Sequence, residues 1–314
     1  MGRKKLLFLA ISALLAVILF FAYVFRYKLA DVFAGLEEKY YARTGGQNGA
    51  EWLNPKSKID YKKITSPALG GKTKEVVVYL PEAYGTQPHK KFPVLYLLHG
   101  FPGNSRQWII NSHLKKYLDE AIKNQALRPV IVVCPDGNGP AVGDSQYVNL
   151  PSQKMEDYIS KDVVGFIDSN YRTIPDRKSR GIGGNSSGAY GAINIALKNN
   201  QVFSLVLSFS GYFGNWDNQL GAVFGNDQTA IDSNSPKNYI GQAALESPTN
   251  IFLGKGSLDW GALGKSNEDF AGLLANKHVN YQLVTVSGIH GWPLWEKMLP
   301  SALVFLNQNL DFGE

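Results

Sequence analysis

The sequence predicts an α/β fold, in which a mostly parallel sheet is covered by helices on both faces. Two observations support this prediction. Short apolar runs of strand length recur between residues 75 and 286, and stretches of helical character separate them. The composition is compatible, because 314 residues with 44% hydrophobic and 18% charged residues suit one large globular domain or two small ones and exclude disorder as the main architecture.

The expected elements follow the chain in order. The apolar runs predict strands at Glu75–Leu80, Pro93–Leu98, Val130–Cys134, Phe203–Ser208, Asn250–Leu253 and Tyr281–Val286. The stretches between and after them predict helices at Leu114–Asn124, Glu156–Asn170, Ser187–Lys198, Asn267–Lys277 and Leu294–Asn309. Because ligands bind beyond the carboxyl ends of the strands in such sheets, we expect functional residues just after each strand.

An apolar segment near the N-terminus predicts a membrane anchor. Leu6–Phe25 has Ser12 as its only notable polar residue, and twenty helical residues span about 30 Å, the thickness of the hydrocarbon core. We expect an uncleaved anchor within residues 1–28, a stalk over 29–55 and a catalytic domain over 56–314. Basic residues before the segment favour an inside N-terminus and an external catalytic domain. The alternative is a cleaved signal peptide and secretion.

Charge and cysteine content exclude several function classes. The formal charge of +6 comes mainly from residues 1–28, which hold five Lys or Arg and no acidic residue; the rest has 27 basic and 26 acidic residues. This near-neutral body argues against nucleic-acid binding. The single cysteine, Cys134, excludes an internal disulfide and a zinc site built on several cysteines. It lies in an apolar run and is expected in the core. We predict no metal and no cofactor.

The motif Gly184-Asn185-Ser186-Ser187-Gly188 provides the candidate nucleophile. It fits a strained turn between a strand and a helix, where side chains two positions either side of the central serine would clash. Such a turn lifts the Ser186 hydroxyl clear at a helix N-terminus, where free N–H groups favour a developing negative charge. Ser187 is the rival nucleophile, but its flanking residues relieve crowding less well.

A serine nucleophile needs a general base, and His290 is the strongest candidate. It lies in a glycine-flanked loop directly after the last expected strand. His99 also follows a strand, but the Gly-rich turn after it suits an oxyanion loop, which His99 is expected to shape. The remaining histidines follow no strand and are expected at the surface; they are His89, His113 and His278.

The acid that orients the base is predicted to be Asp259. It follows the strand Asn250–Leu253 and precedes His290 by one helix and one strand. Glu268 and Asp269 are alternatives inside the next expected helix, which would direct them away from the strand ends. The resulting order of Ser, Asp and His along the chain is typical of α/β-hydrolases.

An oxyanion hole requires two backbone N–H groups. We expect one from Ser187, next to the nucleophile. The other should come from the loop after Leu98, where Phe101 is preferred and Gly103 is the reserve, because Pro102 has no N–H.

With these residues in place, the sequence resembles the putative-esterase family of α/β-hydrolases, which includes S-formylglutathione hydrolases, feruloyl and enterochelin esterases and mycolyltransferases. The resemblance spans about residues 60–310. The matching stretches are Val94–Gly100 with Gly103 and Asn104, Pro135–Gly137, Glu156–Ile159, Ile167–Arg172, the turn through Ala192, Ser210–Phe213, Gly254–Asp259, Gly288–Trp292 and Trp295.

The resemblance implies an α/β-hydrolase fold and a set of site residues. The nucleophile, acid and base of the family fall on Ser186, Asp259 and His290, and its oxyanion donors fall on Phe101 and Ser187. One position departs from the family pattern. Members often carry Met after the nucleophile, where Ser187 stands here, and the smaller side chain can alter the acyl pocket.

The substrate is less well defined by the sequence. Residues 212–247 form a long connection that we expect to cap the site. Aromatic side chains near the site could stack on sugars or aromatic acids, but for any single one of them packing in the core is the favoured role; the candidates are Trp108, Trp216, Trp260 and Trp292. The first functional hypothesis is a membrane-anchored serine carboxylesterase acting on a small-molecule or glycan ester. The alternatives are an acyltransferase of mycolyltransferase type, acting on an envelope sugar, and a non-catalytic binding module.

Overall fold

A computed structural model describes residues 57–139, 143–259 and 263–313 of the chain. Its main sheet has eight strands: β1 (Lys58–Ser66), β2 (Lys72–Leu80), β3 (Val94–Leu98), β4 (Ile131–Pro135), β7 (Arg180–Asn185), β8 (Leu205–Phe209), β9 (Asn250–Leu258) and β10 (Asn280–Ile289). Two short strands, β5 (Asn149–Leu150) and β6 (Gln153–Lys154), form a separate hairpin.

The strand order in the main sheet is β1-β2-β4-β3-β7-β8-β9-β10. The six strands from β4 to β10 run parallel to their neighbours, whereas β2 pairs antiparallel with both β1 and β4. The expected mostly parallel sheet is therefore confirmed. Its parallel strands bring the ends of β3, β7, β9 and β10 to one edge, where the candidate site residues lie.

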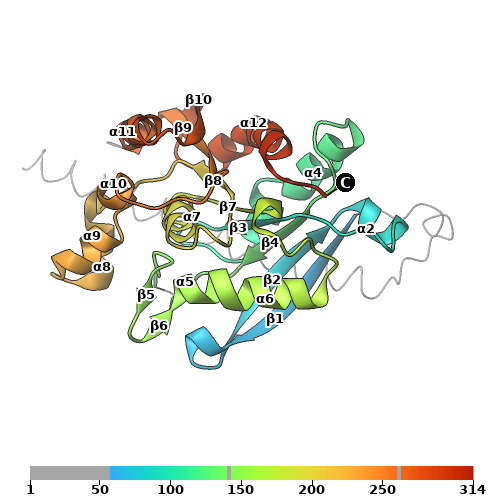
Figure 1. Cartoon of the computed structure of the whole chain (residues 1–314), viewed down its shortest axis with the longest axis horizontal. Helices are drawn as coiled ribbons and strands as arrows, with labels where there is room; N and C mark the ends of the chain where they lie inside the picture. Colours follow the sequence, from blue (N-terminus) through green and yellow to red (C-terminus); the bar gives the residue numbers. More distant parts are fainter. Residues whose placement is uncertain (1–56, 140–142, 260–262, 314) are drawn as a thin grey trace, which may run out of the picture. The chain divides into compact units, whose positions relative to one another are not determined.

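Helices cover both faces of the sheet (Figure 1). One face carries α5 (Met155–Asp157), the π-helix η4 (Tyr158–Val163), α6 (Val164–Asn170), α7 (Ser187–Lys198) and α11 (Leu263–Asn276). On the other face, α4 (Leu114–Lys123) packs against α12 (Trp292–Asn309). Short helices complete the described chain: η2 (Pro67–Leu69), α2 (Glu82–Thr86), α3 (Gln107–Asn111), η5 (Arg177–Ser179), η6 (Trp216–Asn218), α8 (Gln219–Phe224), α9 (Gln228–Ser233) and α10 (Pro236–Tyr239).

The core lies between the sheet and these helices. The central strands β3 and β4 are buried along their whole length, as expected for parallel strands covered on both sides. Cys134 on β4 is 1% exposed, and burial raises the pKa of its thiol. This confirms the expectation that Cys134 is a core residue.

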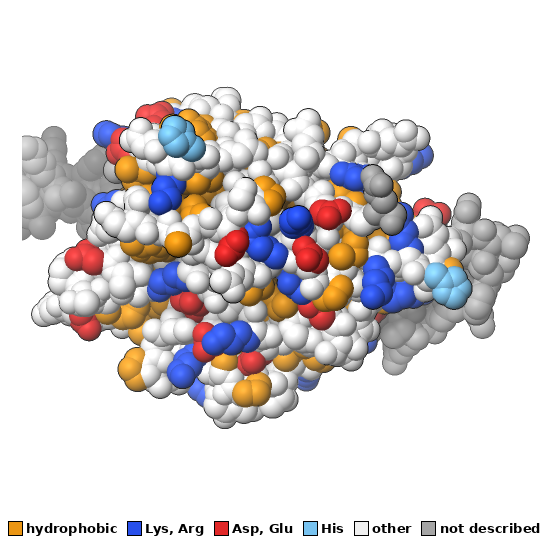
Figure 2. All heavy atoms as spheres, viewed as in Figure 1, with side chains coloured by type: hydrophobic (Ala, Val, Ile, Leu, Met, Phe, Trp, Pro, Cys, Tyr) orange, Lys and Arg blue, Asp and Glu red, His pale blue; other side chains and the backbone are white. Residues whose placement is uncertain are grey.

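The surface carries charges of both signs. On the face shown in Figure 2, Lys and Arg side chains are interspersed with Asp and Glu side chains. Ion pairs of the described residues include Lys161 with Asp157 (3.1 Å) and Lys62 with Asp60 (3.9 Å). This mixture agrees with the near-neutral charge that the sequence gives for the body of the protein.

The expected membrane location requires correction. The predicted anchor Leu6–Phe25 and the stalk 29–55 lie outside the residues that the structure describes. Within 57–139, 143–259 and 263–313, no helix combines the length and apolar character needed to cross a bilayer. For the residues that the structure describes, this finding contradicts the predicted location, a single-pass membrane protein with an inside N-terminus and an external catalytic domain. The boundary at residue 56 stays a prediction.

Candidate active site

Ser186 occupies a strained turn between β7 and α7. Its φ of 54° and ψ of −120° are uncommon for a residue with a side chain. The Ser186 N–H donates to the Phe209 carbonyl on β8, at 3.0 Å, which helps to hold this conformation. The turn places the serine at the N-terminus of α7, as the sequence motif predicts.

Two glycines make the turn sterically possible. A Cβ atom on Gly184 would lie 2.5 Å from the carbonyl of Gly188 and 2.7 Å from that of Leu98. A Cβ atom on Gly188 would lie 2.5 Å from the Leu98 oxygen and 2.6 Å from the His99 oxygen. The obstructing atoms belong to the backbone and cannot rotate away. The nucleophile turn and the chain after β3 are therefore packed backbone against backbone.

This packing predicts the effect of a single methyl group. We expect Gly188→Ala to lower the free energy of unfolding by about 1–3 kcal/mol, because the backbone of β3 or α7 has to shift. Gly165→Ala is the matched control, since a Cβ atom there meets nothing within 4 Å and alanine is favoured over glycine inside a helix. Urea denaturation of both variants measures the difference. Equal stabilities would contradict the close packing.

The structure brings together the three residues predicted to react. His290 follows β10, and Asp259 follows β9. The Nδ1 atom of His290 lies 2.9 Å from Oδ1 of Asp259, and its Nε2 atom lies 3.0 Å from Oγ of Ser186. The His290 side chain is 4% exposed and that of Asp259 is fully buried. One imidazole therefore connects a hydroxyl to a shielded carboxylate.

The surroundings of Asp259 keep it ionised. Burial alone would raise its pKa, but hydrogen bonds from His290 and the Gly256 N–H outweigh burial and hold the pKa below its usual range. The Gly256 N–H donates to Oδ2 of Asp259 at 2.7 Å. Since the carboxylate can only accept, the proton of neutral His290 is on Nδ1. Nε2 then carries the ring's lone pair, and it lies 3.0 Å from the Ser186 hydroxyl.

The predicted oxyanion loop passes directly over the nucleophile turn. A Cβ atom on Gly100 would lie 3.3 Å from Cβ of Ser186, so the backbone that leads into Phe101 is adjacent to the serine. Ser187 is the first residue of α7, and the first N–H groups of a helix have no partner inside the helix. Of the two predicted donors, Ser187 is therefore adjacent to the nucleophile in the chain, and Phe101 follows a residue that is adjacent to it in space.

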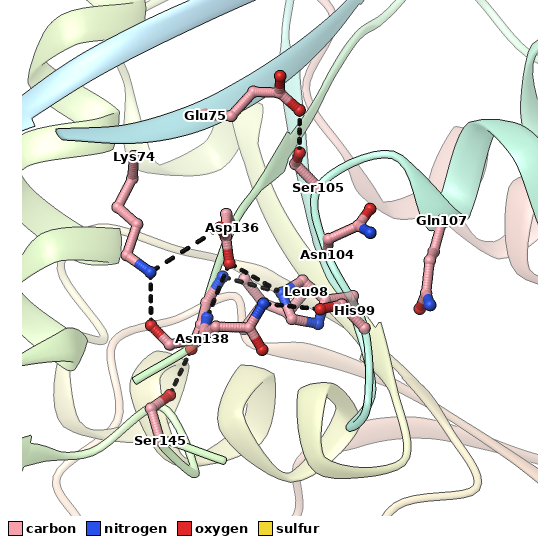
Figure 3. A network of polar contacts seen from close by, with 12 residues as sticks. Lys74, Glu75, Leu98, His99, Asn104, Ser105, Gln107, Asp136, Asn138 and Ser145 are labelled. Carbon is pink, nitrogen blue, oxygen red and sulfur yellow. Dashed lines mark hydrogen bonds and ion pairs between the residues drawn. The ribbon is translucent and has the colours of Figure 1, made fainter. Parts of the chain in front are cut away.

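A network of polar contacts holds the predicted oxyanion loop, residues 99–106, in place (Figure 3). His99 is buried, its Nδ1 donates to the Gly100 carbonyl (2.8 Å), and its Nε2 accepts the Gly137 N–H (2.9 Å). These partners require a neutral ring, which confirms that His99 shapes the loop. Asn138 donates to the Gly103 carbonyl at 2.7 Å, and Lys74 in turn donates to the Asn138 carbonyl at 2.6 Å.

A second anchor ties the far end of this loop to β2. Arg106 donates to both carboxylate oxygens of Glu75, at 2.9 and 2.7 Å, and Ser105 donates to the same carboxylate at 2.6 Å. The hydrogen bond from Arg106 is the main reason that the pKa of Glu75 lies below its usual value. The loop is thus held by β2 as well as by the chain after β4.

Tyr147 also supports the oxyanion loop, although no sequence motif marks it. Its hydroxyl donates to the His99 carbonyl at 2.7 Å, and the residue is 1% exposed. Its ring fills the space that a side chain would need at Gly137 or Gly191, where a Cβ atom would lie 2.1 Å and 2.7 Å from ring atoms. Only tertiary contacts reveal this role, since Tyr147 belongs to no motif.

Two of the four tryptophans expected to bind substrate are placed in packing roles instead. Trp108 is fully buried, and its indole N–H donates to the Leu98 carbonyl at 3.0 Å. Trp292 is 8% exposed and packs edge-on against Trp108, with ring centroids 5.2 Å apart. The candidate role of Trp108 in substrate binding is therefore not supported, and its burial agrees with the favoured alternative of core packing. Trp216 is half-buried, and Trp260 lies outside the described residues.

The connection 212–247 folds into η6, α8, α9 and α10. Helices α8, α9 and α10 lie together at the left side of the view in Figure 1. Tyr212 packs flat on Tyr190 of α7, with ring centroids 5.1 Å apart, and on Trp216, at 5.6 Å. The aromatic residues of this connection thus bind it to the nucleophile helix. Within the part of the chain described, no group of His, Cys, Asp and Glu could hold a metal ion.

Comparisons with known proteins agree with this architecture. A family model described as "Putative esterase" matches residues 66–306. An uncharacterized protein of Corynebacterium glutamicum is 27% identical over 242 residues, which are 73% of this chain and 56% of that protein. The chain thus spans about half the length of this relative.

Two further relatives have named activities. An acetyl esterase of Caldicellulosiruptor saccharolyticus is 23% identical over 252 residues, 72% of this chain and 90% of that enzyme. The solved structure of a ferulic acid esterase superimposes with a TM-score of 0.72 and 25% identity, covering 82% of this chain and 100% of the other. The family match over residues 66–306 and the superposition on a ferulic acid esterase agree with each other and with the fold described above. The chain belongs to the putative-esterase family.

Proposed function

We propose that the protein is a serine carboxylesterase that forms an acyl-enzyme on Ser186. The observation that supports this most directly is the pair of short contacts from one imidazole, 3.0 Å to Ser186 and 2.9 Å to Asp259. Membership of an esterase family supports the same chemistry. The names of the relatives favour small acyl groups or phenolic acids as the acid part of the ester.

In the first step, Oγ of Ser186 attacks the ester carbonyl while Nε2 of His290 takes the hydroxyl proton. The carbonyl oxygen gains a negative charge, which the N–H groups of Phe101 and Ser187 stabilise. Each such donor contributes about 3–4 kcal/mol to the transition state in comparable sites. His290 then protonates the leaving alcohol, and the acyl group stays on Ser186.

In the second step, a water molecule replaces the alcohol. His290 takes its proton, the hydroxide attacks the acyl carbonyl, and the same two N–H groups stabilise the second oxyanion. His290 returns the proton to Ser186 as the acid leaves. The ionised Asp259 stabilises the imidazolium at each stage without accepting a proton itself.

Covalent labelling tests this proposal directly. A fluorophosphonate should form a stable bond to Ser186, because it reacts only with a serine that a nearby base activates. Mass spectrometry of the peptide containing residues 180–198 locates the bond. Labelling should disappear in Ser186→Ala and persist in Ser169→Ala, which removes an exposed serine hydroxyl on α6. An unlabelled wild-type protein, or labelling at another serine, would contradict the proposal.

A further inference from the structure

Asp144 is a carboxylate near the start of the nucleophile helix α7 that the proposed mechanism does not use. It lies between β4 and β5 and is half-buried. Burial raises the pKa of Asp144, and the influences that lower it are the Gln146 backbone N–H, His99, the hydroxyl of Ser187, which follows the nucleophile, and the Gln146 side chain. Asp144 also acts electrostatically on the buried hydroxyls of Tyr190 and Tyr212. The geometry connects Asp144 to the start of the nucleophile helix: Gln146 donates to the carboxylate and accepts from the Tyr212 hydroxyl, and the Tyr212 ring stacks on Tyr190 in the first turn of α7 with centroids 5.1 Å apart.

The Asp144 side chain is fixed in its orientation. Gln146 donates to one carboxylate oxygen from its backbone, at 2.9 Å, and to the other from Nε2, at 2.7 Å. The Tyr212 hydroxyl donates to the amide oxygen of Gln146, so Gln146 cannot turn over. Gln146 and Tyr147 both have positive φ angles, 48° and 54°. Such strained residues persist only where the surroundings hold them, and they cluster at functional sites.

The negative charge of Asp144 has no cationic partner in the described part of the chain. No Lys, Arg or His nitrogen there lies within 4.0 Å of its carboxylate, in contrast to the pairs of Arg106 with Glu75 and Arg180 with Asp168. Burial is the largest influence on its pKa and raises it. A partly desolvated carboxylate that has hydrogen bonds but no ion-pair partner is unfavourable for stability, and near a candidate active site it indicates a function.

We propose that Asp144 selects substrates by charge: it disfavours esters that carry a negative charge near the reacting carbonyl and favours neutral ones. A fixed carboxylate repels a second anion strongly in a partly desolvated site. Asp144 also repels the oxyanion that forms in the transition state, but it does so with every ester. This repulsion therefore does not affect the ratio of kcat/KM between two esters. The inference rests on the proposed esterase activity and adds a substrate class to it.

Two matched pairs of esters test the proposal, one with the charge on each side of the scissile bond. The leaving-group pair is 4-acetoxybenzenesulfonate and 4-acetoxybenzenesulfonamide. The acyl pair is the 4-nitrophenyl ester of 3-sulfopropanoic acid and that of 3-sulfamoylpropanoic acid. The sulfonate is permanently charged, and the sulfonamide has nearly its shape without the charge. In at least one pair, the wild-type kcat/KM should favour the neutral ester by roughly tenfold or more.

Asp144→Asn should raise kcat/KM for the anionic ester of that pair and leave the neutral ester within about threefold, so that the preference is lost. Asp60→Asn on the edge strand β1 is the control for net charge and should keep the wild-type preference. An unchanged preference in Asp144→Asn overturns the proposal. If this variant does not fold, Asp144→Ser replaces it. Equal wild-type values within both pairs also overturn the proposal. If the esterase assignment itself is wrong, the wild-type protein hydrolyses none of the four esters. This result is distinct from hydrolysis without a charge preference.

Discussion

Ser186→Ala is expected to reduce kcat for a neutral ester by about a millionfold, to the residual rate that binding and the oxyanion donors alone support. Without the hydroxyl no acyl-enzyme forms, and His290 has no alcohol to activate. The fold should remain intact, because the variant loses one hydroxyl and keeps the backbone bond from residue 186 to Phe209. Steady-state kinetics and thermal melting of the same preparation measure both effects.

Ser187→Ala separates the nucleophile from its rival. Ser187 is proposed to act through its backbone N–H, which alanine retains, so this variant should lose far less activity than Ser186→Ala. The assignment fails if Ser186→Ala keeps more than about a thousandth of the wild-type turnover while Ser187→Ala abolishes it, because the residual rate without a nucleophile is far lower.

The second large effect is expected for Asp259→Asn, with kcat falling about 10⁴-fold. The amide nearly preserves the shape of the carboxylate and can still accept the Gly256 N–H bond, which spans 2.7 Å in the wild type. Its NH₂ group, however, can donate to Nδ1 of His290, which moves the ring proton to Nε2. Nε2 then faces Ser186 as a donor and cannot take the hydroxyl proton.

Asp269→Asn is the matched control for this variant. Asp269 lies exposed on α11, where it pairs with Lys265 at 2.5 Å, and it was an alternative candidate from sequence alone. Its replacement should change kcat less than about twofold, because exposed ion pairs contribute little. Comparable losses in the two variants would remove Asp259 from its proposed role.

The positions of the reacting residues could be predicted because they follow a simple rule of parallel sheets. Ser186, Asp259 and His290 each come directly after a strand, and the strand ends share one edge of the sheet. Glycines on both sides of Ser186 and His290 marked tight turns. These are local signals, and they need no knowledge of which strands are neighbours.

Other elements were missed for equally physical reasons. Strand β1 is an antiparallel edge strand, and most of its residues are exposed or half-buried, so no apolar run marks it. Strand β7 is buried, but Gly181, Gly183 and Gly184 leave few apolar side chains in it. Strand β9 continues to Leu258, five residues beyond its apolar part, because it pairs with β10 there.

Side-chain roles that depend on tertiary contacts were beyond the sequence. Nothing in the sequence around Trp108 distinguishes a buried tryptophan from an exposed one. Only the structure shows its indole N–H buried and donating to the Leu98 carbonyl. Tyr147 and Asn138 support the oxyanion loop from segments that carry no motif. Their partners are backbone carbonyls of His99 and Gly103, which no residue pattern identifies.

The attachment of residues 99–106 to β2 and to the chain after β4 has a consequence for heat inactivation. A catalytic loop that opened independently would lose activity well below the melting temperature of the protein. Here the loop is bound at both ends to the central layer through Glu75 and Asn138. Warming should therefore leave the rate-enhancing geometry in place until the sheet itself comes apart, so that inactivation and melting share one midpoint.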